Sequence, residues 1–231
     1  MSRVTLDEEL TAHFFRRIEK MKKPLERRFH SCEVRAVPTE SGSIITGRPI
    51  VYGSRTDLGP FDEIIEPGAL DEADLTDIRF LVNHNTDMIP LARSRRNNGN
   101  STMTLTVVPD GMDMEALIDT ENNATARELK SAIDRGDISG MSFMFSIDDE
   151  EWDDLESEHP TRHIRKIGSV VEVSAVTFPA YEATSINARS KEALESARAA
   201  VETARLEARS VETDSNLLEL EKAKTIILGG K

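Results

Sequence analysis

The first segment of the chain carries apolar residues at the three- and four-residue intervals of a helix. These positions are Leu6, Leu10, Phe14, Ile18 and Met21. Thr5 and Glu8 have the spacing of a capping box, and Pro24 cannot continue a helix. Residues 16–28 then hold seven bases and two acids. This stretch is either a solvated helix end with a linker or a docking or cleavable arm.

From about residue 29 to residue 188 the pattern changes to short β-type runs separated by turn residues. Polar and apolar residues alternate in Ser101–Val108 and Met112–Ile118, and Pro109–Gly111 between them is typical of a hairpin turn. Further strands are expected at Cys32–Val37, Ile44–Tyr52, Ile78–Val82, Gly140–Ile147 and Val170–Phe178. Many strands without a repeating strand–helix–strand order favour a β-barrel-like or α+β domain.

One helix is expected inside this region, at Asn123–Arg135, with Gly136 ending it. Its apolar side consists of Ala126, Leu129, Ala132 and Ile133. The stretch Asp148–His159 holds eight acids in twelve residues, which is typical of a solvated or disordered loop. It lacks the ligand order and the turn glycine of a calcium loop, so a metal site there is not expected.

The end of the chain has a different composition, rich in Ala, Glu, Arg and Ser. Its apolar positions from Leu194 to Leu218 follow a heptad spacing but are mostly alanine. A single long helix or a weak association helix is therefore expected instead of a strong coiled coil. Three parts are predicted: a helical N-terminal extension at 1–27, a folded domain at 28–188, and a helical tail at 189–231.

Composition excludes several classes of protein. The chain has 231 residues with 42 acids against 29 Lys and Arg, a formal net charge of −13, so direct nucleic-acid binding is not expected. The single cysteine, Cys32, forms no disulfide within the chain, which favours a reducing, cytosolic setting. No apolar run is long enough for a membrane span, and no secretion signal is recognised at the N-terminus.

The common motifs of cofactor and metal sites are absent from the sequence. It contains no phosphate-binding loop, dinucleotide fingerprint, CxxC pair, HExxH motif or GxSxG elbow, so no cofactor and no metal are expected. His159 and His163 are four residues apart beside Pro160 and are interpreted as surface residues. Cys32 is interpreted as a structural, half-buried residue.

Nucleophilic catalysis remains open. It needs a hydroxyl or thiol, a base, and usually a third group that orients the base, and these lie far apart in many sequences. His84 follows a short apolar run at a predicted strand end, where it is either a catalytic group or a hydrogen-bonded loop histidine. Ser142 lies in an apolar strand. Glu172 also lies in an apolar run, which is costly unless the carboxylate pairs with a histidine or an arginine.

Several short motifs occur in an order that resembles the prohead maturation protease family of tailed bacteriophages. They are Pro67–Leu70 (PGAL), Asn83–Asn85 (NHN), a hairpin, a helix ending in Arg135–Phe143 (RGDISGMSF), and Val171–Tyr181 (VEVSAVTFPAY). The resemblance covers roughly residues 28–189. The family is similar in fold to the herpesvirus capsid assemblins, which implies an α+β domain with a mostly antiparallel β-barrel and peripheral helices.

The resemblance also implies a function. Members of the family are serine endopeptidases packaged in the immature capsid inside the host cell, where they cleave scaffold protein, or the scaffolding segment of the major capsid protein, and themselves. Carried over by motif, His84 is the general base, Ser142 the nucleophile and Glu172 the residue that orients His84. The extensions at 1–27 and 189–231 are then expected to be removed by self-cleavage or used for docking.

Some assignments stay open at this point. Asp87 is close to His84 in sequence and competes with Glu172 for the third position. Ser139 and Ser174 are the alternative hydroxyls if the nucleophile has been misplaced.

The sequence also departs from the family, because Met144 stands where members often have glycine. N–H groups near Arg93–Arg96, or Arg93 itself, are guesses for the oxyanion-hole donors. The competing function is a catalytically inactive capsid assembly or scaffold protein on a protease-derived fold. Self-association is compatible with the resemblance, which leaves the oligomeric state open.

Overall fold

The β-type region of the chain forms two open sheets in a computed structural model that describes residues 24–177, 195 and 197–210. The strands are β1 (Leu25–Ser31), β2 (Arg35–Thr39), β3 (Gly42–Val51), β4 (Arg55–Asp57), β5 (Asp62–Ile65), β6 (Arg79–Val82), β7 (Ala92–Arg93), β8 (Met103–Val108), β9 (Gly111–Ile118), β10 (Gly140–Asp153) and β11 (Thr161–Val176). A short 3-10 helix, η1 (Arg95–Asn97), and one α-helix, α2 (Ala124–Asp134), lie between them. The α+β class is as expected, but these sheets do not close into the barrel that the resemblance implied.

The four-stranded sheet, in the order β2-β3-β9-β8, follows the predicted alternation. On β8, Met103 and Leu105 are buried while Thr104 between them is exposed. The hairpin turn places Gly111 at φ 144°, where an added Cβ would lie 2.0 Å from the backbone oxygen of Ile50. Glycine is therefore required at this turn, since both the backbone angle and the space exclude a side chain.

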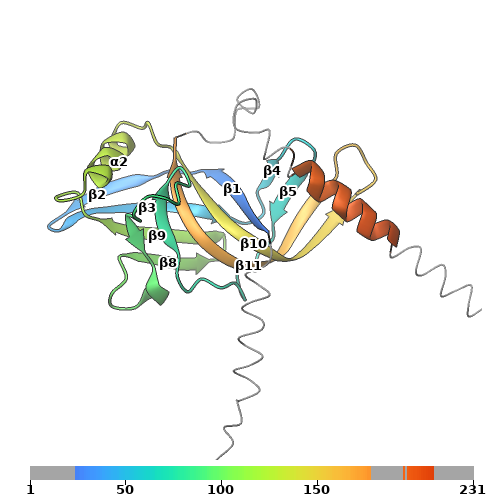
Figure 1. The fold of residues 1–231 in the computed structure, drawn as a ribbon, viewed down its shortest axis with the longest axis horizontal. Helices are drawn as coiled ribbons and strands as arrows, with labels where there is room; N and C mark the ends of the chain where they lie inside the picture. The colour runs from blue at the N-terminus through green and yellow to red at the C-terminus, as the bar shows by residue number, and fades with distance from the viewer. Residues whose placement is uncertain (1–23, 178–194, 196, 211–231) are drawn as a thin grey trace, which may run out of the picture.

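The seven-stranded sheet carries the order β1-β10-β11-β5-β4; β6 pairs with β11, and β7 pairs with β6. β10 and β11 are its longest strands and run side by side across the molecule (Figure 1). The first half of β10, Gly140–Ser146, is buried throughout. It packs against β3, where an added Cβ on Gly47 would lie 2.5 Å from the sulfur of Met141. A strand covered on both sides explains why the sequence there is almost continuously apolar.

Two strands pair with β11 in parallel and bring distant residues to the same place. β5 pairs with the start of β11, and β6 pairs with its end, where Ser174 lies opposite Leu81 and Ala175 opposite Val82. The chain therefore leaves β6 beside the last residues of β11. This pairing decides where His84, two residues beyond β6, is placed.

The helix α2 begins and ends within one residue of the predicted helix. The Asn123 side chain accepts a hydrogen bond from the backbone N–H of Ala126 at 3.3 Å, so Asn123 acts as the N-cap. Ala126, Leu129 and Ile133 are buried, as their helical spacing predicts.

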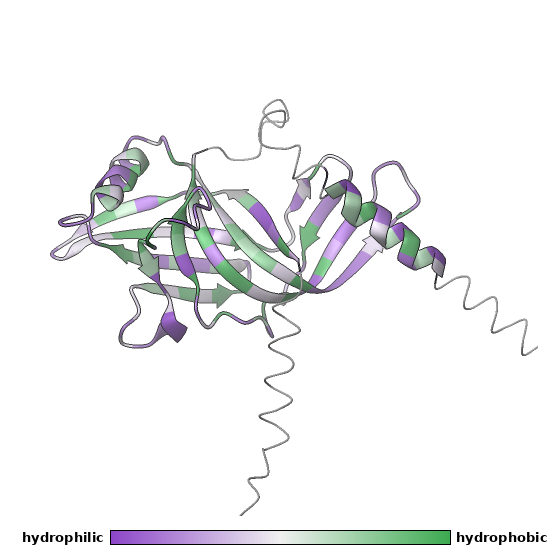
Figure 2. Cartoon of the chain, in the orientation of Figure 1, coloured by the Kyte–Doolittle hydropathy of each residue, from purple (hydrophilic) through white to green (hydrophobic). Residues whose placement is uncertain are grey.

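The expectation of a disordered or solvated loop at Asp148–His159 is wrong for residues 148–153. These acids extend β10 instead of forming a loop; most of them are exposed, and some pair with bases on β11. Glu150 binds Arg162, and Glu151 binds Arg165 at 2.6 Å. Figure 2 shows the polar character of this end of the β10–β11 hairpin. The sequence pattern missed the strand because its partners lie across the sheet.

The boundary of the N-terminal extension also differs from the prediction. Residues 25–27, assigned to the extension at 1–27, are the start of β1, which pairs with β10 along its whole length. The predicted helix over Leu6–Met21 lies outside the described residues.

Part of the predicted helical tail is described. Residues 197–210 are helical, and the Arg205 side chain donates to the backbone oxygens of Leu155 at 3.0 Å and Ser157 at 2.8 Å in the β10–β11 turn. The apolar end of the tail, like residues 178–194, lies outside the described residues. Within the described part of the chain, no helix is both long enough and apolar enough to span a membrane.

Candidate active site

Ser142 lies in the buried half of β10. Its neighbour across the sheet on β11 is Ser174, and the next pair on the same face is Met144 with Glu172. Side chains of alternate residues point to the same face of a strand, so Ser142, Ser174 and Glu172 share one face of the β10–β11 pair. Ser142 is 1% exposed.

His84 is presented to this face by an unusual turn. Asn83 and His84 have φ values of 52° and 57°, in the left-handed region that non-glycine residues seldom adopt. The Asn83 side chain holds the turn, because its oxygen accepts hydrogen bonds from the backbone N–H of Thr177 at 3.1 Å and the hydroxyl of Thr177 at 3.2 Å. The backbone N–H of Asn83 donates to the oxygen of Ala175 at 2.9 Å. The motif around His84 is thus fastened to the end of β11.

The imidazole of His84 joins the hydroxyl and the carboxylate. His84 Nε2 lies 2.5 Å from Ser142 Oγ, and His84 Nδ1 is hydrogen-bonded to Glu172 Oε1. The His84 side chain is 15% exposed and that of Glu172 is 2% exposed. A buried carboxylate is costly unless it has partners. The sequence analysis left open whether the partner of Glu172 is a histidine or an arginine, and in the structure it is His84.

Ser174 supports both members of this contact. Its hydroxyl donates to Glu172 Oε2 at 2.6 Å, and its oxygen accepts from the backbone N–H of His84 at 3.1 Å. Sequence reasoning considered Ser174 only as an alternative nucleophile. Its spacing of two residues from Glu172 in a strand was the signal that it shares the face of that carboxylate.

The other candidates lie elsewhere. Asp87 is exposed, and its backbone N–H donates to the side-chain oxygen of Asn85 at 3.1 Å; the carboxylate on the Nδ1 side of His84 is that of Glu172. Ser139 is exposed just before β10. Met144 is 7% exposed and packs in the sheet.

The guessed oxyanion-hole donors already have acceptors inside the fold. The backbone N–H of Arg93 donates to the Thr102 hydroxyl at 2.9 Å, and that of Arg96 donates to the Thr76 oxygen at 2.8 Å. The Arg93 guanidinium binds Asp77 with two contacts of 2.5 Å, and this hydrogen bonding lowers the pKa of Asp77 below its ordinary range. These groups are occupied in the fold.

His163, His159 and Cys32 have ordinary surroundings in the described part of the chain. His163 lies between Glu66 at 2.6 Å and Asp153 at 3.1 Å. His159 lies 3.1 Å from Asp62 on the surface. Cys32 is half-buried, and burial raises the pKa of its thiol, which leaves it protonated and unreactive at neutral pH.

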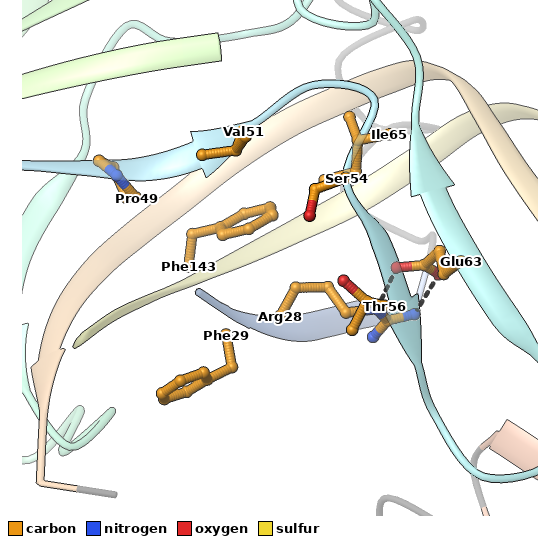
Figure 3. Close-up of a pocket in the computed structure, with 9 residues that line it drawn as sticks. All are labelled: Arg28, Phe29, Pro49, Val51, Ser54, Thr56, Glu63, Ile65 and Phe143. Carbon is orange, nitrogen blue, oxygen red and sulfur yellow. Dashed lines mark hydrogen bonds and ion pairs between the residues drawn. The ribbon is translucent and has the colours of Figure 1, made fainter. Parts of the chain in front are cut away.

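The strand β1 covers the hydroxyl of Ser142. Phe29 of β1 lies opposite Ser142, and the Ser142 hydroxyl donates to the backbone oxygen of Arg28 at 2.6 Å. The Arg28 side chain turns to the other face of the sheet, where its Nε and Nη2 groups donate to the carboxylate of Glu63 (Figure 3). The chain itself therefore occupies the space in front of Ser142.

The arrangement has the parts of nucleophilic acyl transfer. A hydroxyl is hydrogen-bonded to an imidazole, and a buried carboxylate holds the second nitrogen of that ring. In serine proteases such a combination removes a proton from the hydroxyl and stabilises the charged imidazole that results.

Comparisons with known proteins place the chain in a family. The family model described as "Caudovirus prohead serine protease" matches residues 30–198. Among solved structures, the capsid assembly protease of bacteriophage T4 is similar with 15% sequence identity and a TM-score of 0.42, over 68% of this chain and 99% of that one. No curated protein matches the sequence. Because the family model covers most of the chain, the protein belongs to the caudovirus prohead serine protease family.

Proposed function

We propose that this protein is a serine endopeptidase of phage capsid maturation with Ser142 as the nucleophile, His84 as the general base and Glu172 as the residue that orients His84. The observation that carries the proposal is the imidazole of His84, which bridges the Ser142 hydroxyl and the Glu172 carboxylate. Family membership supports the same chemistry.

The reaction is acyl transfer in two halves. His84 Nε2 takes the hydroxyl proton as Ser142 Oγ bonds to the carbonyl carbon of the substrate. The peptide C–N bond then breaks, and His84 gives the proton to the leaving amine. Water hydrolyses the acyl-enzyme with His84 again as the base. Glu172 keeps the Nδ1 proton in place throughout and stabilises the imidazolium.

The proposed substrates are the scaffold protein, or the scaffolding segment of the major capsid protein, and the chain itself. The proposed place of action is the interior of the prohead in the host cell. Family membership supports both proposals. The nearness of β1 to Ser142 supports self-cleavage in particular.

The test compares the native chain with Ser142→Ala by intact mass spectrometry, alone and together with the capsid protein. A fluorophosphonate probe, which labels activated serines, is applied to the same samples. Ser139→Ala is the matched control, because Ser139 is an exposed serine three residues away. We expect truncated products and labelling in the native chain and in Ser139→Ala, and neither in Ser142→Ala.

The competing function is an inactive assembly protein on a protease-derived fold. It would leave every sample at full length and unlabelled, with and without the capsid protein. Products that persist in Ser142→Ala would instead mean that another group or another protease makes the cut.

A further inference from the structure

The strand β1 lies in front of Ser142 in the way that an extended peptide lies in a protease. It pairs antiparallel with β10 from Leu25 to Ser31, and addition of a strand to a sheet is a common way to bind an extended peptide. One peptide bond of β1 is next to the hydroxyl. It is the bond between Arg28 and Phe29, because the Arg28 oxygen accepts from Ser142 Oγ at 2.6 Å.

The hydrogen bond from Ser142 Oγ to the Arg28 oxygen limits how far Oγ can be from the carbonyl carbon of Arg28. A carbonyl bond is about 1.2 Å long, so the carbonyl carbon of Arg28 lies within about 3.8 Å of Ser142 Oγ. Reacting atoms in a near-attack arrangement are about 3–3.5 Å apart. In this structure the one hydroxyl proton of Ser142 is donated to the carbonyl oxygen of Arg28. Attack therefore requires that proton to turn to His84 Nε2, 2.5 Å from Oγ, and the peptide to turn until its carbon faces Oγ.

The side chain of Arg28, the residue before this bond, is bound by the carboxylate of Glu63. Arg28 Nη2 donates to Glu63 Oε2 at 2.6 Å, and Arg28 Nε donates to Glu63 Oε1. The Glu63 side chain is 2% exposed. A two-point contact with a carboxylate fits the planar guanidinium of arginine and fits lysine less well.

The residues around the Arg28 side chain match its aliphatic part and its guanidinium group, and we call the space they line the Arg28 pocket. Its lining includes Val51, Ile65 and Phe143, which are apolar, and Ser54 and Thr56, which are polar (Figure 3). The free space left beside Arg28 is only about 20 Å³, which is close to the room for one water molecule. Arg28 is itself one of the walls of this space.

One other base, Arg162, lies near the pocket. It is 3.4 Å from Glu63 and has closer contacts with Glu26 and Glu150. If residues 1–28 left, Glu26 would leave with Arg28, and the Glu63 carboxylate would lose its two-point partner and keep its contact with Arg162. A buried carboxylate that has lost its partner favours the binding of another cation.

We propose that the Arg28–Phe29 bond is the internal cleavage site of this chain, and that Glu63 selects arginine at the residue before the scissile bond in substrates generally. The proposal rests on the proposed function and names the substrate of that same site.

Cleavage follows the same chemistry with named atoms. Ser142 Oγ bonds to the carbonyl carbon of Arg28, and its proton passes to His84 Nε2. The bond from that carbon to the Phe29 nitrogen breaks, and the proton goes from His84 to the new amine of Phe29. Water then releases the Arg28 carboxylate from Ser142. Residues 1–28 leave with the first part of β1, Leu25–Arg28, which takes the Arg28 carbonyl away from Ser142 and the Arg28 side chain out of its pocket.

The first experiment is intact mass spectrometry of the full chain during storage. We expect a product that begins at Phe29 and is absent in Ser142→Ala. Arg28→Ala is expected to slow this cut by about 100-fold or more, since a site built for a polar partner rejects a group that lacks it. Arg27→Ala is the matched control, because Arg27 is the exposed neighbour, and it is expected to leave the rate unchanged.

The second experiment tests Glu63 in trans. The cleaved enzyme is given a synthetic peptide of residues 22–34 and the same peptide with glutamate in place of Arg28. Glu63→Gln keeps the shape of the side chain and is expected to lower kcat/KM for the arginine peptide by about 100-fold. Glu63→Arg is expected to prefer the glutamate peptide. The fluorophosphonate probe reports whether each variant still has an active Ser142.

The outcomes separate this proposal from the proposed function. A Ser142-dependent cut at another bond, or equal rates for both peptides with native Glu63, would refute the proposal and leave the protease intact. An unchanged rate in a Glu63→Gln enzyme that still reacts with the probe would also refute it. Loss of all probe labelling and all cutting in the native chain would overturn the proposed function itself.

Discussion

Ser174→Ala tests whether Ser174 positions the site or acts as its nucleophile. The change removes the hydrogen bond to Glu172 Oε2 and the acceptor of the His84 N–H, both at a fully buried position. A hydrogen bond to a charged group contributes about 1.5–3 kcal/mol. If the lost hydrogen bonds stabilise mainly the state in which the His84 imidazole is charged, their removal lowers kcat by about 10- to 100-fold.

Stability also falls, because a buried N–H without a partner costs about 1–3 kcal/mol. For a chain of this size the melting temperature drops by about 2–4 °C for each kcal/mol. The assay is cleavage of the peptide of residues 22–34 well below the melting temperature, with the pH dependence of kcat. Ser146→Ala is the control, since Ser146 is another buried serine of the sheet, bonded to Ser169 at 3.0 Å.

We expect Ser146→Ala to change the melting temperature and to leave kcat unchanged. A loss in Ser174→Ala as large as that in Ser142→Ala would identify Ser174 as the nucleophile. An unchanged kcat in Ser174→Ala would mean that Ser174 does not position Glu172 and His84.

Three further predictions concern single residues. Glu172→Gln should lower kcat by roughly 10³- to 10⁴-fold with little effect on KM, because the charge that stabilises the His84 imidazolium is lost; steady-state kinetics with an unchanged kcat would contradict this role. Gly111→Ala should lower the free energy of unfolding by about 1–3 kcal/mol in urea, from backbone strain and the contact with the Ile50 oxygen, and an unchanged midpoint would be evidence against that contact. Burial raises the pKa of Glu26, but its two arginine partners lower it further, to a net value below the ordinary range. The stabilisation by the ionised Glu26 is therefore present above the ordinary glutamate pKa of about 4.3 and is lost as the pH falls through the lowered value. In a Ser142→Ala background, the difference in unfolding free energy caused by Glu26→Gln should shrink from pH 7 to pH 3. A constant difference would refute the assignment.

Local sequence patterns predicted the strands and the helix that bury one face in the core and expose the other. The alternation in Ser101–Val108 and Met112–Ile118 predicted β8 and β9, because every second side chain enters the core. The spacing of Leu129 and Ile133, with Asn123 as a cap, predicted α2 within one residue at either end. These features depend on residues that are close in sequence, so the sequence contains them directly.

Elements held by distant charges were missed. The bases at residues 16–28 indicated either a solvated helix end with a linker or a docking or cleavable arm; neither interpretation showed that the Arg28 side chain is largely covered and bound to Glu63 of β5. The acids at 148–153 indicated a loop, but they pair with bases on β11. In both cases the partner is more than ten residues away, and no local pattern shows which opposite charges will meet.

The sequence by itself indicated a prohead protease through the order of its short motifs, and it proposed His84, Ser142 and Glu172 while leaving Asp87, Ser139 and Ser174 as alternatives. Only the tertiary structure decided that these three side chains meet, because that depends on the parallel pairing of β6 with β11 and the antiparallel pairing of β10 with β11. It alone placed Arg28 over Ser142 and inside a pocket ending in Glu63. Pairing between strands far apart in the chain follows from the packing of the whole core, which no stretch of sequence specifies alone.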